Sequence, residues 1–156
     1  MSIFVSGFEF HRLSKWSFCP RYPVKFEPSE IKENDIVFLI LDCFERFIQV
    51  LEKCSSLTHK FKLITHNSDK SFTRAHLIRL LPFITHIYAL NNTCIDTTVT
   101  TIPIGFVDNR YKPHYMFKEL HEKLNEKTIL AYLNFSIQTN VLIRQRCYNH
   151  FKHYRG

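Results

Sequence analysis

Glycine, methionine and tryptophan are scarce in this sequence of 156 residues, which contains three, two and one of them, respectively. So few glycines, together with only six prolines, exclude collagen-like and flexible low-complexity proteins. No apolar run approaches the roughly 18 residues that cross a bilayer, which predicts that the chain has no membrane span. The N-terminus lacks a basic segment followed by a long apolar stretch, so we expect no secretory signal.

The cysteines and histidines show no disulfide or metal pattern. The five cysteines are odd in number and widely spaced, and no two form a C-x-x-C pair, so we expect neither a disulfide framework nor a zinc finger. Free thiols are typical of reducing compartments, which predicts an intracellular protein. Of the nine histidines, only His150 and His153 lie one helical turn apart. Because no third ligand is close to them in sequence, we expect no metal site.

Positive charge gathers at the two ends of the chain. The net charge is +7, and residues 1–25 hold four basic residues and one acidic residue. Residues 141–156 hold four basic residues and no acidic one, whereas residues 26–140 are neutral overall. Two basic, aromatic ends are compatible with a solvated surface, with a contact to a partner protein, or with nucleic acid, on whose bases aromatic rings can stack.

From residue 35 onward, continuous apolar runs alternate with helix-spaced apolar stripes. The run Ile36–Leu41 predicts a strand buried on both faces, and further strands are expected at residues 60–65, 86–89, 98–102 and 128–133. Helices are expected between and after them, around residues 44–51, 77–81, 115–125 and 140–151. This order predicts an α/β fold, with a Rossmann-like, doubly wound and mostly parallel sheet over residues 35–156.

The first 34 residues follow no single periodicity. Aromatic residues recur through them, and three prolines interrupt them. We expect residues 1–34 to form either an aromatic N-terminal arm or short strands packed on the domain that follows.

Short polar side chains collect in four segments that follow predicted strands. These segments are residues 66–69, 91–93, 103–110 and 134–140. Ligands bind at the carboxyl ends of the strands in open α/β sheets, and side chains of this kind suit hydroxylated ligands such as sugars. The same residue types also favour turns and helix N-caps, so each residue taken alone has a structural interpretation as well. Neither G-x-x-x-x-G-K-[ST] nor G-x-G-x-x-G occurs, and Gly105 is expected to adopt a positive φ or to allow a close backbone approach.

Several short blocks in these same regions resemble the exostosin-like glycosyltransferases, most closely those of giant DNA viruses and some microbes. The blocks are KFKLITHNSD, YALN, TIPIGF, YLNF and the stretch from TN to RQRCY, at residues 60–69, 88–91, 101–106, 132–135 and 139–148. The resemblance covers roughly residues 34–152. Family members tend to have an Asn and a Trp after the Pro-Ile-Gly turn, where this chain reads VDNRY at 107–111.

The resemblance implies one half of a GT-B-type, two-domain architecture that moves a sugar from a nucleotide sugar to an acceptor hydroxyl. In that architecture the N-terminal domain shapes the acceptor side, and the C-terminal domain supplies most contacts to the donor nucleotide. From this resemblance we expect the chain to correspond to the N-terminal domain alone, as an acceptor-side half or a truncated relative that does not complete transfer unaided. The implied cofactor situation is no tightly bound group, with a nucleotide sugar as donor when a second domain or partner chain is supplied.

Transfer requires a base for the acceptor hydroxyl and polar groups for the substrate. His66 and Asp69 are the candidate bases. The candidate substrate-binding residues lie in the same polar segments, and they are Asn67, Asn91, Gly105, Asp108, Arg110 and Asn134. The expected partners are a second domain and an acceptor glycan, and the location is the host cytoplasm or the virion if the source is viral. The alternative function is a non-catalytic viral structural or assembly module, whose basic, aromatic ends bind a partner protein or nucleic acid.

Overall fold

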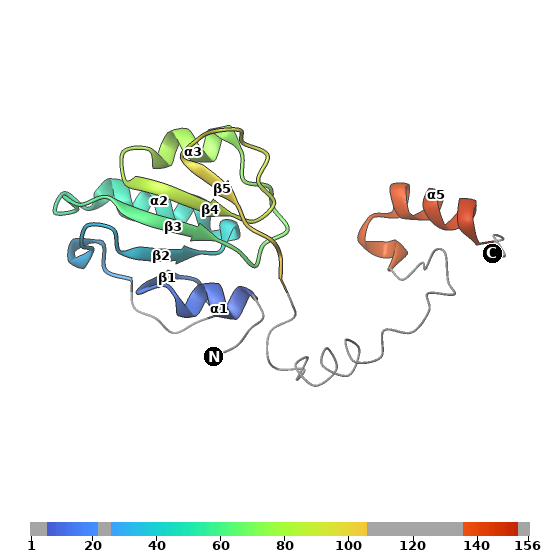
Figure 1. Ribbon diagram of the computed structural model, residues 1–156, viewed down its shortest axis with the longest axis horizontal. Coiled ribbons are helices and arrows are strands. Elements are labelled where there is room, and N and C mark those ends of the chain that lie inside the picture. The colour runs from blue at the N-terminus through green and yellow to red at the C-terminus, as the bar shows by residue number, and fades with distance from the viewer. Residues whose placement is uncertain (1–5, 22–25, 106–135, 153–156) are drawn as a thin grey trace. The chain divides into compact units, whose positions relative to one another are not determined.

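The computed structural model describes residues 6–21, 26–105 and 136–152 (Figure 1). The chain divides into two compact units, Met1–Pro113 and His114–Gly156. The first unit contains the whole described sheet, and the second contains the C-terminal helix.

A five-stranded, all-parallel sheet forms the centre of the first unit (Figure 1). Its strands pair in the order in which they occur along the chain. They are β1 (Trp16–Phe18), β2 (Ile36–Leu39), β3 (Phe61–Thr65), β4 (Ile84–Ala89) and β5 (Val99–Thr101). Parallel strands require crossover connections. The connections after β2 and β3 each contain an α-helix, which gives the alternation of strand and helix that the sequence pattern predicts there. The expected α/β, Rossmann-like fold is therefore confirmed.

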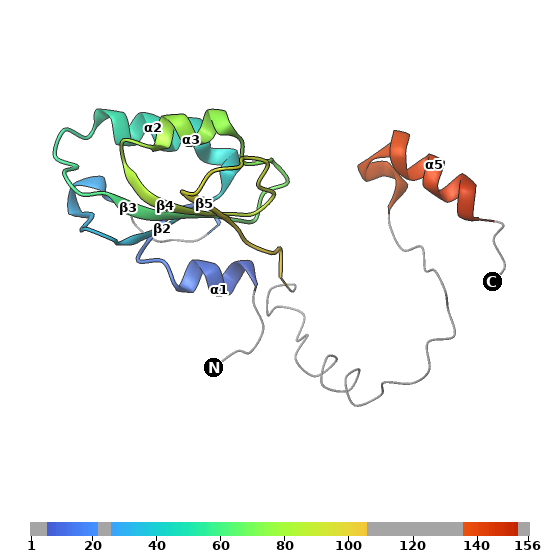
Figure 2. The ribbon, with the colours of Figure 1, turned by 45° about the horizontal axis from the view of Figure 1, so that its top comes forward.

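Helices cover both faces of this sheet (Figure 2). The helices α2 (Phe44–Lys53) and α3 (Arg74–Leu80) lie on one face, and α1 (Gly7–Arg12) lies on the other. Two short 3-10 turns, η1 (Pro28–Glu30) and η2 (Leu41–Cys43), complete the connections around β2. α1 precedes β1, so it is not part of a connection between two described strands. The second face is therefore covered by a helix that comes before the sheet in the sequence.

The larger core lies between the sheet and the pair α2 and α3. The predicted stripe of α2 is buried, since Phe47 and Ile48 are fully covered, and Leu77 and Leu80 of α3 pack into the same cluster. Every strand contributes side chains to this side. A smaller cluster on the opposite face contains Cys19, Phe38, Ile40 and Ile64, with Phe10 of α1 packed against it. The buried β2 and β3 side chains on both faces confirm that this part of the sheet is covered twice, as its continuous apolar runs predict.

The regular elements agree with the sequence patterns to within a few residues, where they are described. The strands at 36–41, 60–65, 86–89 and 98–102 correspond to β2, β3, β4 and β5. The helix expected around 77–81 ends at Leu80, just before Pro82, which cannot continue a helix. The helix expected at 115–125 and the strand at 128–133 lie outside the described residues. Within 1–34, β1 pairs in parallel with β2 and forms an edge of the sheet.

The second unit contributes η4 (Ile137–Thr139) and α5 (Val141–Phe151) to the described residues. The Asn140 side chain caps α5 by accepting a hydrogen bond from the backbone N–H of Ile143 at 3.4 Å. The predicted helix at 140–151 is therefore confirmed. Across the described ranges, no helix is both long and apolar enough to span a membrane.

Candidate functional site

The predicted polar segments that are described lie at one edge of the sheet. His66 and Asn67 directly follow β3, Asn91 follows β4, and Gly105 lies four residues after β5. These three strands are parallel neighbours, so their carboxyl ends share an edge (Figure 1). The segments also contact one another, because the Asn91 Nδ2 donates to the Ser68 carbonyl oxygen at 3.1 Å. The structure thus brings together, at one edge, the segments that hold His66, Asn67, Asn91 and Gly105.

His66 lies beneath this edge rather than on it. Its side chain points toward the face of the sheet that α1 covers, and the residue is only 2% exposed. Nδ1 lies 2.8 Å from Oδ1 of Asn67, and Nε2 lies 3.2 Å from the carbonyl oxygen of Pro103. The Phe10 ring packs against the imidazole, with the ring centroids 5.1 Å apart. Both ring nitrogens are therefore occupied, and His66 joins the end of β3 to the segment after β5.

Asn67 and Asn91 adopt left-handed backbone conformations, with φ values of 59° and 51°. Asparagine tolerates this region better than most residues, which explains its presence where each strand turns sharply. The Asn67 side chain lies against Gly7 of α1, where a Cβ atom would come within 1.9 Å of its Oδ1. The backbone of each asparagine thus turns the chain at the edge, and each side chain contacts a neighbouring residue or segment.

Asp69 is the most accessible of the candidate bases. It is exposed on the segment after β3, and no hydrogen bond or ion pair to its carboxylate occurs among the described residues. Its neighbours are held in place, since the Lys70 backbone N–H donates to Ser68 Oγ at 3.1 Å. A carboxylate in this position can accept a hydrogen bond from a ligand hydroxyl. Of the two candidate bases, Asp69 alone has an open side chain.

The segment after β4 forms its own hydrogen-bonded turn. Asn92 Nδ2 donates to the Cys94 carbonyl oxygen at 3.0 Å, and its Oδ1 accepts from the Cys94 backbone N–H at 2.8 Å. The Phe72 backbone N–H donates to the Asn91 carbonyl oxygen at 3.0 Å, which attaches this turn to the segment after β3. These contacts support the structural interpretation of the polar residues here, because they stabilise the turn itself.

Gly105 has a φ of 72°, which confirms the positive φ expected at this position. The remaining predicted site residues, Asp108, Arg110 and Asn134, lie outside the described residues. No group of three or more His, Cys, Asp or Glu side chains within the described ranges is arranged to hold a metal ion.

The contribution of α1 to this edge was not predicted. Ser6 caps the helix by accepting a hydrogen bond from the Glu9 backbone N–H at 3.3 Å. Ser-x-x-Glu is the sequence pattern of a helix N-terminus, so residues 6–9 did contain a signal for α1. Nothing in that pattern indicates that Gly7 and Phe10 would meet Asn67 and His66, because those contacts join segments almost 60 positions apart.

The basic residues near the N-terminus are partly neutralised. Arg12 forms an ion pair with Glu9 at 3.1 Å, and Lys15 forms one with Asp35 at 2.8 Å.

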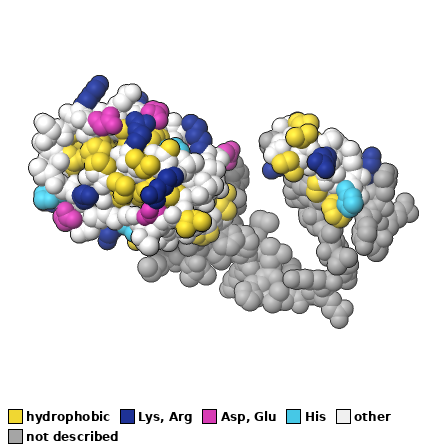
Figure 3. Space-filling view, turned by 90° about the horizontal axis from the view of Figure 1, so that it is seen from above, with side chains coloured by type: hydrophobic (Ala, Val, Ile, Leu, Met, Phe, Trp, Pro, Cys, Tyr) yellow, Lys and Arg dark blue, Asp and Glu magenta, His cyan; other side chains and the backbone are white. Residues whose placement is uncertain are grey.

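Acidic, basic and apolar side chains are intermixed on the surface of the first unit that is seen from the side of α3 (Figure 3). Arg79 of α3 forms an ion pair with Glu45 of α2 at 2.7 Å. This face therefore does not present a charge of one sign.

Comparison with known proteins finds no relative of this chain. No protein-family model, curated protein or solved structure matches the chain.

Proposed function

We propose that this chain is a glycosyltransferase-like domain of exostosin-like type, which serves the acceptor side of sugar transfer from a nucleotide sugar. One observation carries the proposal. The described residues of three blocks with this resemblance, 60–69, 88–91 and 101–105, comprise β3, the end of β4, the end of β5 and the segments after them. Blocks separated in sequence therefore meet at one sheet edge, which is where α/β domains bind ligands.

The side chains at this edge divide into two groups by their role. His66, Asn67 and Asn91 already make hydrogen bonds within the protein, and they hold the segments after β3, β4 and β5 together. Asp69 is exposed and available to an acceptor hydroxyl. In this proposal Asp69 accepts the hydrogen bond from the acceptor sugar and serves as the base, while His66 positions the segment that carries it.

The experiment is saturation-transfer NMR on the full chain with a panel of neutral oligosaccharides. We expect saturation transfer to at least one oligosaccharide, its loss in Asp69→Asn, and its retention in Glu52→Gln. Glu52 is an exposed residue of α2, so this control removes the same charge away from the edge. Absence of transfer to every oligosaccharide, or equal transfer to wild type and Asp69→Asn, contradicts the proposal.

Calorimetric titration with UDP- and GDP-sugars tests whether the domain binds a donor nucleotide sugar without a second domain. The chain has no phosphate-binding loop motif, so we expect no saturable binding below about 1 mM, equivalent to about −4.1 kcal/mol. Micromolar binding that His66→Ala abolishes would instead identify a transferase that needs no second domain.

A second candidate function is partner binding through α5, and it rests on a different observation. Leu142 and Ile143 are 76% and 64% exposed, and the basic Arg146 is exposed on the same helix. Exposed apolar residues beside arginine are typical of protein interfaces. Size-exclusion chromatography with light scattering tests this function for a second copy of the chain. A dimer that Leu142→Asp dissociates supports it, and a monomer in both forms contradicts it.

A further inference from the structure

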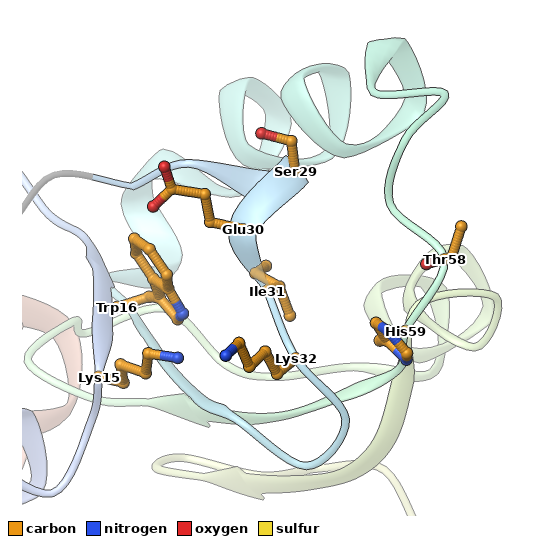
Figure 4. Close-up of a pocket in the computed structure, with 8 residues that line it drawn as sticks. All are labelled: Lys15, Trp16, Ser29, Glu30, Ile31, Lys32, Thr58 and His59. Atoms are coloured by element: carbon orange, nitrogen blue, oxygen red, sulfur yellow. The ribbon is translucent and has the colours of Figure 1, made fainter.

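A cavity of about 490 Å³ lies at the edge of the sheet opposite to the candidate site (Figure 4). Three parts of the chain line it, each of them just before a strand or at its start. They are the beginning of β1 (Lys15 and Trp16), the connection that leads to β2 (Ser29, Glu30, Ile31 and Lys32) and the turn before β3 (Thr58 and His59). Its volume is in the range of small-molecule sites. The cavity shares no residue with the carboxyl-edge site.

Asp35 connects the two segments that carry the lysines of this cavity. Its Oδ2 accepts hydrogen bonds from Lys15 Nζ at 2.8 Å, from Trp16 Nε1 at 3.0 Å and from the Lys32 backbone N–H at 3.0 Å. Burial alone would raise the pKa of Asp35, but the hydrogen bonds from Lys15, Lys32 and Trp16 outweigh it and lower that pKa below its ordinary value of 3.8. Asp35 is therefore ionised at neutral pH, and it holds β1 and the β2 connection together.

Of the two lysines at the cavity, one has an ionic partner among the described residues and the other has none. The Lys15 ammonium is paired with Asp35, and the His59 ring lies 3.7 Å from a carboxylate oxygen of Glu33. The Lys32 ammonium makes no ion pair or hydrogen bond within the described part of the chain. In Figure 4 the Lys15 and Lys32 side chains extend toward each other, while the Glu30 carboxylate points away from them. The lysines thus provide a pair of converging ammonium groups of which only one is neutralised.

Two largely buried apolar residues, Trp16 and Ile31, line the cavity beside these ammonium groups. Trp16 and Ile31 are 9% and 3% exposed, so they present only an edge to the cavity and are fixed by the core beneath. The Trp16 indole is fixed further by its hydrogen bond to Asp35. A fixed apolar surface next to an unneutralised ammonium suits a molecule with an apolar part and an anionic group.

We propose that this cavity binds a small organic anion, with its phosphate or carboxylate at Lys32 and Lys15 and its apolar part against Trp16 and Ile31. Lysine binds such groups as a point charge, and here the two ammonium groups approach the anion from two segments of the chain. This site is independent of the proposed sugar-binding edge, because it lies at the amino ends of the strands.

Trp16 is the only tryptophan in the sequence, so its fluorescence reports directly on this cavity. The full chain is titrated separately with phenyl phosphate, benzoate and benzyl alcohol. We expect a saturable fluorescence change with at least one of the two anions and none with benzyl alcohol, and the stronger anion identifies the preferred group. No saturable change with either anion up to about 10 mM, or an equal change with benzyl alcohol, overturns the proposal.

Two matched variants test the role assigned to Lys32. Lys32→Gln should weaken anion binding about tenfold, the effect of losing one charge-assisted hydrogen bond. Its unfolding midpoint should not change, because the ammonium makes no hydrogen bond or ion pair with another described residue. Lys70→Gln removes the same charge at the opposite edge, where Lys70 lies 3.6 Å from Asp42, and should bind like wild type. Equal affinities for Lys32→Gln and wild type, or an equal loss in both variants, overturns the assignment.

Discussion

Replacing Gly7 with alanine would place a methyl group where the Asn67 side chain now lies. The new Cβ would be 1.9 Å from Asn67 Oδ1, whereas ordinary contact begins at 3.4 Å. The amide would have to move by about 1.5 Å, the difference between these distances, and that shift breaks its 2.8 Å hydrogen bond to His66. The substitution therefore tests whether α1 is locked onto the end of β3.

The expected cost combines three effects. Losing the hydrogen bond costs about 1 kcal/mol, and overpacking costs about 1–3 kcal/mol. Alanine is favoured over glycine by roughly 0.5–1 kcal/mol in the middle of a helix, and Gly7 is the first residue of α1, so this preference offsets at most that much. We expect Gly7→Ala to lower the free energy of unfolding by about 1–3 kcal/mol, measured by urea denaturation with Trp16 fluorescence as the probe.

A second background makes the test specific. Asn67→Gly removes the obstructing side chain, and glycine readily adopts the φ of 59° found there. In that background Gly7→Ala should be neutral or should stabilise by up to about 1 kcal/mol, since only the helix preference remains. Equal costs in the two backgrounds would refute the proposed contact between Gly7 and Asn67.

Three other predictions concern the sheet and α3. Leu63 is fully buried, so Leu63→Ala should cost about 2–5 kcal/mol in urea denaturation, while Ile78→Ala, at a site 57% exposed, should change stability by less than about 0.5 kcal/mol. The buried Thr65 hydroxyl has no hydrogen-bond partner within the described residues, so Thr65→Val should stabilise by about 1 kcal/mol; a loss of stability would reveal a partner. His76 Nδ1 accepts from the Thr73 backbone N–H at 3.0 Å at the start of α3. Burial lowers the pKa of His76 below its ordinary 6.5, aided by Arg79 and Lys70 and opposed by Glu45. The unfolded chain then binds more protons, so the contribution of His76 is fully present above about pH 6.5 and is lost as the pH falls toward the folded-state pKa. His76→Gln should flatten the pH dependence of stability between about pH 7 and 5, and an unchanged slope would contradict this assignment.

The strongest periodic segments allowed the fold to be predicted from sequence. A continuous run such as Ile36–Leu41 has few alternatives to a buried strand, and the stripe of Phe44, Phe47, Ile48 and Leu51 fits a helix that covers it. β1 could not be assigned, because three residues do not establish a period and its pairing with β2 supplies the missing constraint. The parallel arrangement followed from the alternation of the elements rather than from any one of them.

The candidate site could be predicted only in outline. The edge was predictable, because residues that follow parallel strands must share it. The accessibility of the side chains was not, since His66 and Asp69 are three positions apart and yet one is buried and the other exposed. That difference arises from Phe10 and Pro103, which reach His66 from distant segments. The amino-edge cavity likewise depends on three segments that no local pattern connects.

The order of the strands has a consequence for how the protein is made. Each strand pairs with the one translated immediately before it, and paired residues lie 12 to 26 positions apart, from Ile87 with Val99 to Ile36 with Lys62. A nascent chain leaving the ribosome can therefore add each strand to a completed neighbour without waiting for distant sequence. Such short closures favour rapid folding among parallel sheets, which otherwise fold slowly because of long-range pairing. The contact of α1 with the end of β3 is the longer wait, because Gly7 cannot meet Asn67 until residue 67 has emerged.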